Sequence, residues 1–290
     1  MTTVCDVMDD LRAMAAVKAA LAEDVGEGDA TTLALVDPAA RATGEILARE
    51  ACRVAGVTVA RAVLTCVDPA LRVAVIVPDG ETVDPGDTIL TIEGKATSIL
   101  TAERTALNFM QRMCGIATLT ARFVKAVEAY GTMILDTRKT TPNLRLFEKY
   151  AVTCGGGTNH RFGLYDRVLV KDNHRRLWQG GDPDRLDLAV AAAREAFPLL
   201  EVEIEVESVA ECQSALRGRP EWIMLDNMSC EMMRTCVALC RGVSKTEASG
   251  GITLARAQEV AATGVDAISL GCLTHSAPSV DLALEWRAVQ

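Results

Sequence analysis

Residues 201–227 read EVEIEVESVAECQSALRGRPEWIMLDN and combine two β-like runs with a helical stretch between them. Alternation and apolar spacing predict a strand over 201–207, a helix over 209–217 and a strand over 222–227. A helix that connects two strands in this way usually brings them side by side in parallel. This stretch therefore predicts an α/β fold built on a parallel sheet.

The same alternation of strand and helix continues on both sides of this unit. Further strands are predicted over 132–139, 167–173, 245–249 and 267–271, with a short one around Asn159 and His160, and further helices over 184–196, 230–240 and 253–263. Six or seven such units in series, without a GxGxxG fingerprint, favour a barrel over a doubly wound sheet.

The N-terminal part has a different pattern. Residues 7–23 and 98–129 have the apolar spacing of helices, whereas 44–77 contain short β-like runs. Residues 77–94, VPDGETVDPGDTILTIEG, carry turn signals between short apolar runs, a pattern also typical of lipoyl and biotinyl carrier domains. The nearby Lys95 follows a glycine at the end of this stretch, so a structural role is favoured over a carrier role.

Composition narrows the class of protein. The chain has 290 residues, 49% of them hydrophobic, and a net charge of −9, which argues against a nucleic-acid-binding surface. No apolar run approaches the ~18 residues of a membrane span, and the N-terminus is acidic, so we expect a cytoplasmic protein with no membrane partner. The ten cysteines contain no CxxC pair and are predicted to be buried small hydrophobes in a reducing compartment.

Positive charge is concentrated in one segment of this acidic chain. Residues 136–176 contain nine Lys/Arg against four Asp/Glu. So local a surplus suits a small, highly anionic ligand. Within it, CGGGTNHR (154–161) lacks the GK[ST] ending of a P-loop, and its glycines are predicted to form a flexible approach to the His160 strand. Four of the cations are predicted to be solvated charges or contacts between subunits: Arg145, Lys149, Arg175 and Arg176.

Nearly every predicted barrel strand brings a polar residue or a glycine to its C-terminal end. The residues at these strand ends are Arg138, Lys139, His160, Arg161, Lys171, Glu205, Asp226, Ser249, Gly250, Gly251, Ser269, Leu270 and Gly271. In β/α barrels the strand C-termini form the active-site rim, and the late loops commonly bind phosphate. The pattern therefore predicts an active site with a phosphate-binding region.

The strand 201–207 places four glutamates on one face, at positions 201, 203, 205 and 207. In a parallel barrel both faces are covered, so buried carboxylates need partners, and Lys139, Lys171 and Arg161 are the expected ones. Glu205 and Asp226 could hold ribose hydroxyls or Mg²⁺. Whether Glu201, Glu203 and His174 touch a ligand stays open. The residues thus predict an enzyme whose substrate carries several negative charges.

Several motifs resemble the quinolinate phosphoribosyltransferase family (nicotinate-nucleotide pyrophosphorylase, carboxylating), in its bacterial form. They are ALAEDVGEGDATT (20–32), ERTALNFMQRMCGIAT (103–118), TRKTTP (137–142), EKYAVTCGGGTNHRFGLYDRVLVKDNH (148–174), EVEIEVES (201–208), IMLDNMS (223–229), EASGGIT (247–253) and SLGCLTHSAP (269–278). One position departs from the family pattern, since Asn143 stands where the family usually has glycine.

The resemblance implies an N-terminal α/β-sandwich domain and an incomplete, seven-stranded, TIM-like α/β barrel. The domains are expected at 1–115, with 275–290 packing back on it, and at 116–274. The family transfers phosphoribosyl from phosphoribosyl pyrophosphate (PRPP) to quinolinate with decarboxylation, giving nicotinate mononucleotide, pyrophosphate and CO₂ in de novo NAD synthesis. It requires Mg²⁺ and forms homodimers, with a hexamer left open.

The resemblance also assigns roles to residues of this chain. Lys139, Lys171, Glu205 and Asp226 are expected to be catalytic, and Glu205 and Asp226 to bind Mg²⁺. The residues expected to bind substrate are Thr137, Arg138, Lys139, His160, Arg161, Lys171, Glu205, Asp226, Ser249, Gly250, Gly251, Ser269, Leu270, Gly271 and, from the neighbouring subunit, Arg104. Three alternatives remain: the related group associated with molybdenum transport, nicotinate phosphoribosyltransferase, and a non-catalytic phosphate-binding module.

Overall fold

The computed structural model describes residues 6–178 and 181–289, and the chain divides into two compact units. The first comprises Met1–Ala121, Lys139–Gly156 and Cys272–Gln290, and the second comprises Arg122–Arg138 and Gly157–Gly271. Cys5 and the start of the acidic N-terminal segment lie outside the described residues. The boundaries predicted from the sequence, after residues 115 and 274, stay a prediction.

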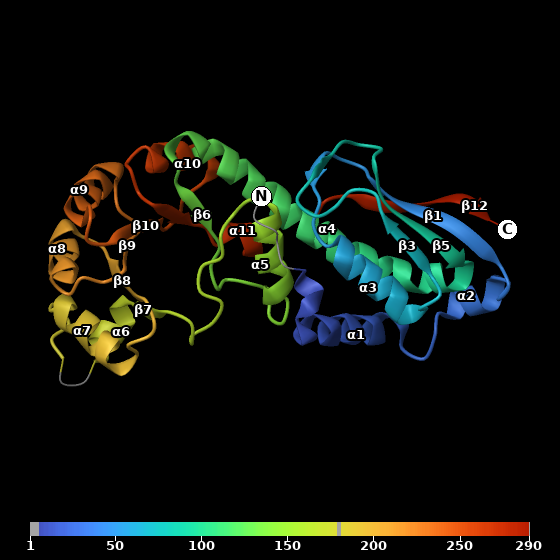
Figure 1. Cartoon of the computed structure of the whole chain (residues 1–290), viewed down its shortest axis with the longest axis horizontal. Helices are drawn as coiled ribbons and strands as arrows, with labels where there is room; N and C mark the ends of the chain where they lie inside the picture. Colours follow the sequence, from blue (N-terminus) through green and yellow to red (C-terminus); the bar gives the residue numbers. More distant parts are fainter. Residues whose placement is uncertain (1–5, 179–180, 290) are drawn as a thin grey trace. The chain divides into compact units, whose positions relative to one another are not determined.

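The first unit contains an antiparallel sheet in the order β12-β1-β5-β3, with helices packed along it (Figure 1). Its strands are β1 (Arg41–Ala48), β2 (Cys52–Arg53), β3 (Arg72–Val75), β4 (Thr82–Val83), β5 (Thr88–Lys95) and β12 (Leu282–Val289). Its helices are η1 (Val7–Asp9), α1 (Leu11–Val25), α2 (Ala30–Leu35), α3 (Val57–Val67), α4 (Ala96–Val127, whose last turns belong to the second unit), α5 (Arg145–Cys154) and α11 (Cys272–His275). The strand β12 pairs with β1, so residues near the end of the sequence join a sheet otherwise formed by residues 41–95.

Residues 44–77 are only partly β structure. The helix α3 occupies Val57–Val67, where the sequence favoured short strands. Its β-branched residues favour strands locally, but Val57, Ala60, Val63 and Leu64 are all buried, and this is the spacing of a single helix face. Tertiary burial of that face therefore overrides the local preference.

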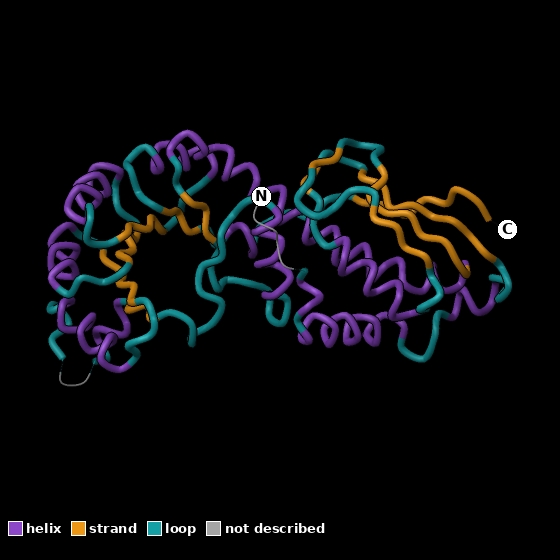
Figure 2. Tube along the Cα trace, viewed as in Figure 1, coloured by secondary structure: helices purple, strands orange, loops and turns teal. Residues whose placement is uncertain are grey.

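The second unit is built on a six-stranded parallel sheet in the order β6-β11-β10-β9-β8-β7. The strands are β6 (Met133–Leu135), β7 (Val168–Val170), β8 (Val202–Val206), β9 (Trp222–Asp226), β10 (Lys245–Ser249) and β11 (Ala267–Ser269). The helices are η2 (Glu128–Tyr130), α6 (Asp172–Arg176), α7 (Leu186–Ala196), α8 (Val209–Arg217), α9 (Cys230–Cys240) and α10 (Leu254–Ala261). Figure 2 shows the sheet curving inside the arc of helices.

The predicted seventh strand is reduced to one bridge. Thr158 pairs in parallel with Leu135 of β6, and the chain then continues to His160 without a further ladder. With this bridge, the six strands reproduce the predicted incomplete barrel. Helices α7 to α10 fall within or beside their predicted ranges, whereas the sequence did not indicate α5 and α6.

The register brings the carboxyl ends of the strands to one edge. Ser249 of β10 pairs with Asp226 of β9, and Val206 of β8 pairs with Leu225 of the same neighbour. All five residues of β8 are buried, as expected for a parallel strand that is covered on both faces. Residues just beyond these strands therefore share one rim.

Nine cysteines lie in the described part of the chain and all nine are free, as predicted. Seven are buried and behave as small core side chains, whereas Cys66 is exposed and Cys272 is half-buried. No helix among the described residues is long and apolar enough to cross a membrane.

Candidate functional site

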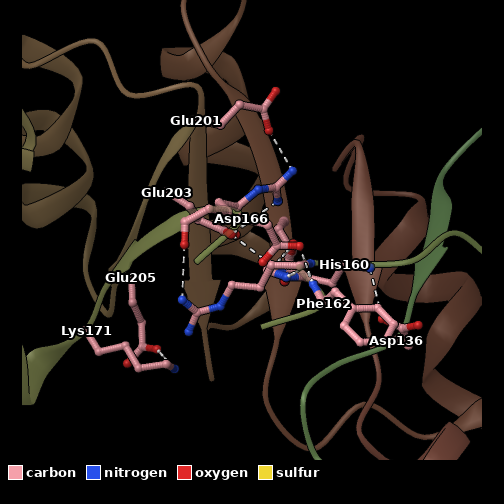
Figure 3. Close-up of polar contacts among 11 residues, drawn as sticks. Asp136, His160, Phe162, Asp166, Lys171, Glu201, Glu203 and Glu205 are labelled. Carbon is pink, nitrogen blue, oxygen red and sulfur yellow. Dashed lines mark hydrogen bonds and ion pairs between the residues drawn. The ribbon is translucent and has the colours of Figure 1, made fainter. Parts of the chain in front are cut away.

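A cluster of carboxylates and one lysine lies at the rim of the second unit. Lys171 follows β7, and its Nζ lies 2.7 Å from Oε2 of Glu205 on β8 (Figure 3). Carboxylate oxygens of Glu205, Glu207 and Asp226 all lie within 4.8 Å of one another. The predicted pair Glu205 and Asp226 therefore comes together, and Lys171 is a correctly predicted partner.

Glu207 is the third carboxylate of this cluster, which the sequence prediction left out. It stands two residues after Glu205, on the same face of the strand, and this alternation was the signal for it. Asn227, also missed, donates a hydrogen bond from Nδ2 to Oδ2 of Asp226 at 2.7 Å. Converging carboxylate oxygens are the donor type that Mg²⁺ prefers, so the cluster fits the predicted ion.

A second, fully enclosed cluster surrounds His160. Its Nε2 lies 3.0 Å from Oε2 of Glu203 and 3.4 Å from Oε2 of Glu247. Arg167 bridges Glu203 of β8 and Glu201, which precedes that strand, with contacts of 3.4 Å and 2.6 Å. Glu203 and Glu247 are both 0% exposed. The partners predicted for a buried glutamate were Lys139, Lys171 and Arg161. The charge of Glu203 does act on Arg161, but its direct contacts are with His160 and Arg167, which were not predicted as partners.

Burial and charge shift the pKa values in this cluster. Burial acts to lower the pKa of His160, but its contacts with Glu203 and Glu247 raise it to about 9. Burial, reinforced by the charge of Glu203, raises the pKa of Glu247. Burial also opposes ionisation of Glu203, yet His160 and Arg167 together lower its pKa. His160 and Glu247 therefore keep protons more readily than isolated groups would, whereas Glu203 is favoured as a carboxylate.

Two arginines face the rim close to each other. Burial lowers the pKa of Arg161, and electrostatic repulsion from the nearby Arg138 lowers it further. Arg161 also donates from Nη1 to the carbonyl of Arg167 at 3.2 Å. Two positive side chains held close together in a half-buried position repel each other, and an anion bound between them relieves this repulsion.

The loop after β10 has a backbone that requires glycine. Gly250 has φ +96°, and a Cβ built on it would lie 2.2 Å from Oδ1 of Asn227. Gly251 also has positive φ, +57°, but faces open space. Ser249 accepts a hydrogen bond from the Asn227 N–H at 3.0 Å, so this loop is fixed against the end of β9. Its position and shape suit a phosphate-binding turn.

The second predicted phosphate-binding segment, residues 269–271, offers fewer free backbone N–H donors than expected. Ser269 ends β11 and is buried. The N–H of Leu270 donates to the carbonyl of Leu135 at 2.9 Å, so the sheet already uses that donor. Gly271 is half-buried beyond it.

Lys139 and Arg104 lie in the first unit, whereas the other predicted site residues lie in the second. Both are exposed. The carbonyl of Lys139 accepts a hydrogen bond from Oγ1 of Thr274 at 2.7 Å. Thr137 and Arg138, which precede it, are half-buried at the end of β6. The remaining open residue, His174, accepts the Lys171 N–H at Nδ1 (3.0 Å) and so supports Lys171 locally.

Buried charges hold the loop that follows Lys139. Glu148 is 1% exposed, binds Arg112 at 2.8 Å, and accepts hydrogen bonds from the N–H and hydroxyl of Thr141. Asn143 has φ +66°, a left-handed conformation that asparagine tolerates better than most residues, which explains how it stands where the resemblance expects glycine.

Two predictions for this segment were wrong. Lys149 is 1% exposed, and the Arg175 side chain is 11% exposed with Glu211 3.0 Å away, so neither is a solvated charge. The helix α5 turns Lys149 inward, and Arg175 of α6 is paired with Glu211 of α8. Gly155 ends α5, where a Cβ would lie 2.5 Å from the carbonyl of Ala117. The first glycine of the triplet therefore permits close packing, and is not a flexible approach.

Comparison with known proteins agrees with this geometry. Residues 29–114 match the family model of the quinolinate phosphoribosyl transferase N-terminal domain, and residues 116–285 match that of the C-terminal domain. The chain is 39% identical over 269 residues to a probable nicotinate-nucleotide pyrophosphorylase [carboxylating] of Synechocystis, covering 91% of this chain and 89% of that protein. It is 37% identical over 263 residues to the Bacillus subtilis protein of the same name, with the same coverage. Among solved structures it is similar to NadC from Streptococcus pyogenes, with a TM-score of 0.89, 41% identity and 95% of each chain covered.

Proposed function

Because the chain belongs to the quinolinate phosphoribosyl transferase family, we propose that the rim of its second unit is the place where quinolinate and PRPP react. The enzyme transfers phosphoribosyl from PRPP to quinolinate with decarboxylation, giving nicotinate mononucleotide, pyrophosphate and CO₂. This is a step of de novo NAD synthesis. The observation that carries the site is the meeting of Lys171, Glu205 and Asp226 at the ends of neighbouring strands.

Quinolinate carries two carboxylates, and the cations of the rim suit them. Arg138, Arg161 and Lys171 bind these carboxylates and orient the ring nitrogen towards the anomeric carbon of PRPP, a positioning effect that lowers the entropic part of the barrier. Thr137, Lys139 and His160 complete this pocket. Arg104 reaches it from the second subunit of a homodimer, and assembly beyond the dimer is left open.

PRPP lies along the carboxylate cluster. Glu205 and Asp226 bind the ribose hydroxyls and, with Glu207 as an additional oxygen donor, would hold Mg²⁺. When bound, Mg²⁺ supplies positive charge that stabilises the pyrophosphate leaving group. Ser249, Gly250, Gly251, Ser269, Leu270 and Gly271 hold the 5′-phosphate, with the glycines letting the backbone approach its oxygens.

The charges that develop during the reaction explain why the site contains both carboxylates and cationic side chains. Positive charge grows on the sugar ring as the bond to pyrophosphate breaks, and the carboxylates of Glu205 and Asp226 stabilise it. Lys139 and Lys171 stabilise the negative charge that develops on the pyrophosphate leaving group. The quinolinate nitrogen forms the new bond to the anomeric carbon as the bond to pyrophosphate breaks. The adjacent positive pyridinium nitrogen then stabilises the electron pair left at the 2-position when CO₂ departs, and that carbon takes up a proton from solvent.

A direct assay tests this proposal. The protein is incubated with PRPP and Mg²⁺ and with either quinolinate or nicotinate, and pyrophosphate and CO₂ are measured. We expect both products with quinolinate and little pyrophosphate with nicotinate, which would also separate the enzyme from a nicotinate phosphoribosyltransferase. A parallel sample treated with a chelator should be inactive until Mg²⁺ is restored. No pyrophosphate release with quinolinate would overturn the proposal. The cytoplasmic location stays a prediction from the sequence.

A further inference from the structure

Arg112 and Glu148 form a largely buried ion pair next to the loop that follows Lys139. Oε1 of Glu148 accepts hydrogen bonds from Nε and Nη2 of Arg112, at 3.2 and 2.8 Å. The same carboxylate accepts the N–H of Thr141 at 3.0 Å and its hydroxyl at 2.9 Å. Glu148 is 1% exposed, so these donors replace the water that a carboxylate would otherwise bind. The ion pair therefore ties Thr141 to the helices α4 and α5.

The same arginine also holds the segment that contains Thr274. Nη1 of Arg112 donates to the carbonyl of Ala277 at 2.8 Å, and Nη2 donates to the carbonyl of Thr274. Thr274 is 0% exposed, and its hydroxyl donates to the carbonyl of Lys139 at 2.7 Å. A guanidinium presents its donors in fixed directions, so Arg112 fixes α11 and the Glu148 carboxylate relative to each other. The carbonyl of Lys139 is therefore fixed, through Thr274, to this arginine.

The network joins sequence motifs that lie far apart in the chain. Its four members lie in four of the motifs quoted for the resemblance: Arg112 in residues 103–118, Thr141 in 137–142, Glu148 in 148–174 and Thr274 in 269–278. All four belong to the first unit, and none of them was expected to bind substrate. Through Thr274 the network contacts Lys139, which is a residue of the proposed site.

We propose that this network, formed by Arg112, Glu148 and Thr274, positions Lys139 for the reaction. The inference rests on the proposed function, because Lys139 is one of the cations that stabilise the pyrophosphate leaving group. Lys139 is exposed and its four-carbon side chain is flexible, so the place of its backbone limits where Nζ can reach. A misplacement of about 1 Å can cost about a hundredfold in rate, so the network controls turnover without contacting substrate.

Hydrogen–deuterium exchange, read at single residues by nuclear magnetic resonance, tests the network without turnover. In the wild type the Thr141 amide should exchange slowly although Thr141 is an exposed residue, because its N–H donates to Glu148. Glu148→Gln has one acceptor oxygen, which cannot serve both Arg112 and the Thr141 N–H, so exchange of this amide should become at least about tenfold faster. The Ala60 amide of α3, which donates to the Gly56 carbonyl at 2.9 Å, is the internal control for folding. An unprotected Thr141 amide in the wild type would overturn the proposal.

Variants of Thr274 test the effect on the reaction. Thr274→Val removes the hydroxyl that holds Lys139 and should lower kcat about fivefold, as for one lost hydrogen bond, with the KM for PRPP within twofold. Thr274→Ser keeps the hydroxyl and should stay within twofold of the wild type. Thr120→Val is the matched control, because it removes a buried hydroxyl that donates to the Ile116 carbonyl of its own helix at 2.8 Å, and it should leave kcat unchanged. Thermal unfolding of all three shows that they fold. Wild-type kcat in Thr274→Val, or an equal loss in Thr274→Ser, would refute the proposal.

A double-mutant cycle asks whether Thr274 acts through Lys139. In a Lys139→Ala background, assayed at high enzyme concentration, Thr274→Val should lower the residual kcat by less than about twofold, because the side chain that it positions is absent. If the full fivefold loss persists there, Thr274 acts independently of Lys139 and the proposal fails. Quinolinate turnover by the wild type is measured alongside. Its absence would refute the proposed function, whereas exchange of the Thr141 amide decides separately whether the network holds the loop.

Discussion

Lys171 Nζ lies 2.7 Å from Oε2 of Glu205; Lys171 directly follows β7, and Glu205 belongs to the adjacent parallel strand β8. The Lys171 side chain is 43% exposed, so its charge faces the rim, whereas that of Glu205 is only 11% exposed. The ion pair therefore joins the proposed quinolinate pocket to the proposed PRPP carboxylates.

Lys171→Ala should lower kcat/KM for quinolinate at least a hundredfold, because it removes a cation that binds a carboxylate and stabilises the leaving charge. The fold should survive, since the Lys171 side chain is 43% exposed. Steady-state kinetics and a thermal unfolding curve measure the two effects. Lys245→Ala, which removes a cation from the amino end of β10, is the control and should retain activity. Near-full activity in Lys171→Ala would show that the pocket is assigned wrongly.

Arg104 and Lys139 allow a test of the proposed shared site. If Arg104 acts in the neighbouring subunit, Arg104→Ala and Lys139→Ala homodimers should each have little activity, but a mixed dimer should recover part of it, because one of its two sites keeps both residues. Differently tagged chains, copurified and assayed, measure this. Confirmed mixed dimers without recovery would place Arg104 in its own subunit's site or outside any site.

Much of the second unit could be predicted from the sequence because its strands and helices alternate and its chemistry sits at strand ends. Lys171, Glu205 and Asp226 are on the rim for that reason. The pairing of His160 with Glu247 could not be predicted in this way. It joins residues far apart in the sequence, and only the sheet order, which places β8 next to β9 and β9 next to β10, brings both glutamates to one ring.

Burial accounts for the remaining misses. Val57–Val67 has strand-forming residues, yet becomes a helix because one helical face can be buried. Lys149 was predicted to be a surface charge because lysines are usually exposed. Nothing in the neighbouring residues indicated that α5 would turn its side chain inward. The local sequence indicates secondary-structure propensity and hydrophobic periodicity. Whether a segment becomes a buried helix, or a lysine is buried, depends on which other elements pack against it.

Asp79 gives the first unit a pH-dependent contribution to stability. It accepts hydrogen bonds from the Val57 N–H at 3.0 Å and the Tyr150 hydroxyl at 2.7 Å, and burial raises its pKa above the ordinary value for an aspartate. A raised folded pKa means that its stabilising contribution is complete below about pH 3.8 and is lost as the pH rises through the folded pKa. Asp79→Asn should therefore lower the free energy of unfolding by more near pH 4 than at pH 7. Denaturant unfolding of both proteins at several pH values measures this difference, and a cost that grows with pH would contradict it.

Gly250 and Gly251 offer a matched pair for the proposed phosphate loop. Gly250→Ala would place a Cβ 2.2 Å from Oδ1 of Asn227, at a φ of +96°, so the loop must move away from the end of β9. Gly251→Ala has the same positive-φ cost, about 1 kcal/mol, but meets no atom within 4 Å. We expect Gly250→Ala to raise the KM for PRPP at least tenfold and Gly251→Ala to raise it less, with the KM for quinolinate little changed in both. Initial-rate kinetics with each substrate varied in turn distinguish the cases. If Gly250→Ala binds PRPP as well as the wild type does, the loop is not the phosphate site, because its displacement would then leave the phosphate contacts intact.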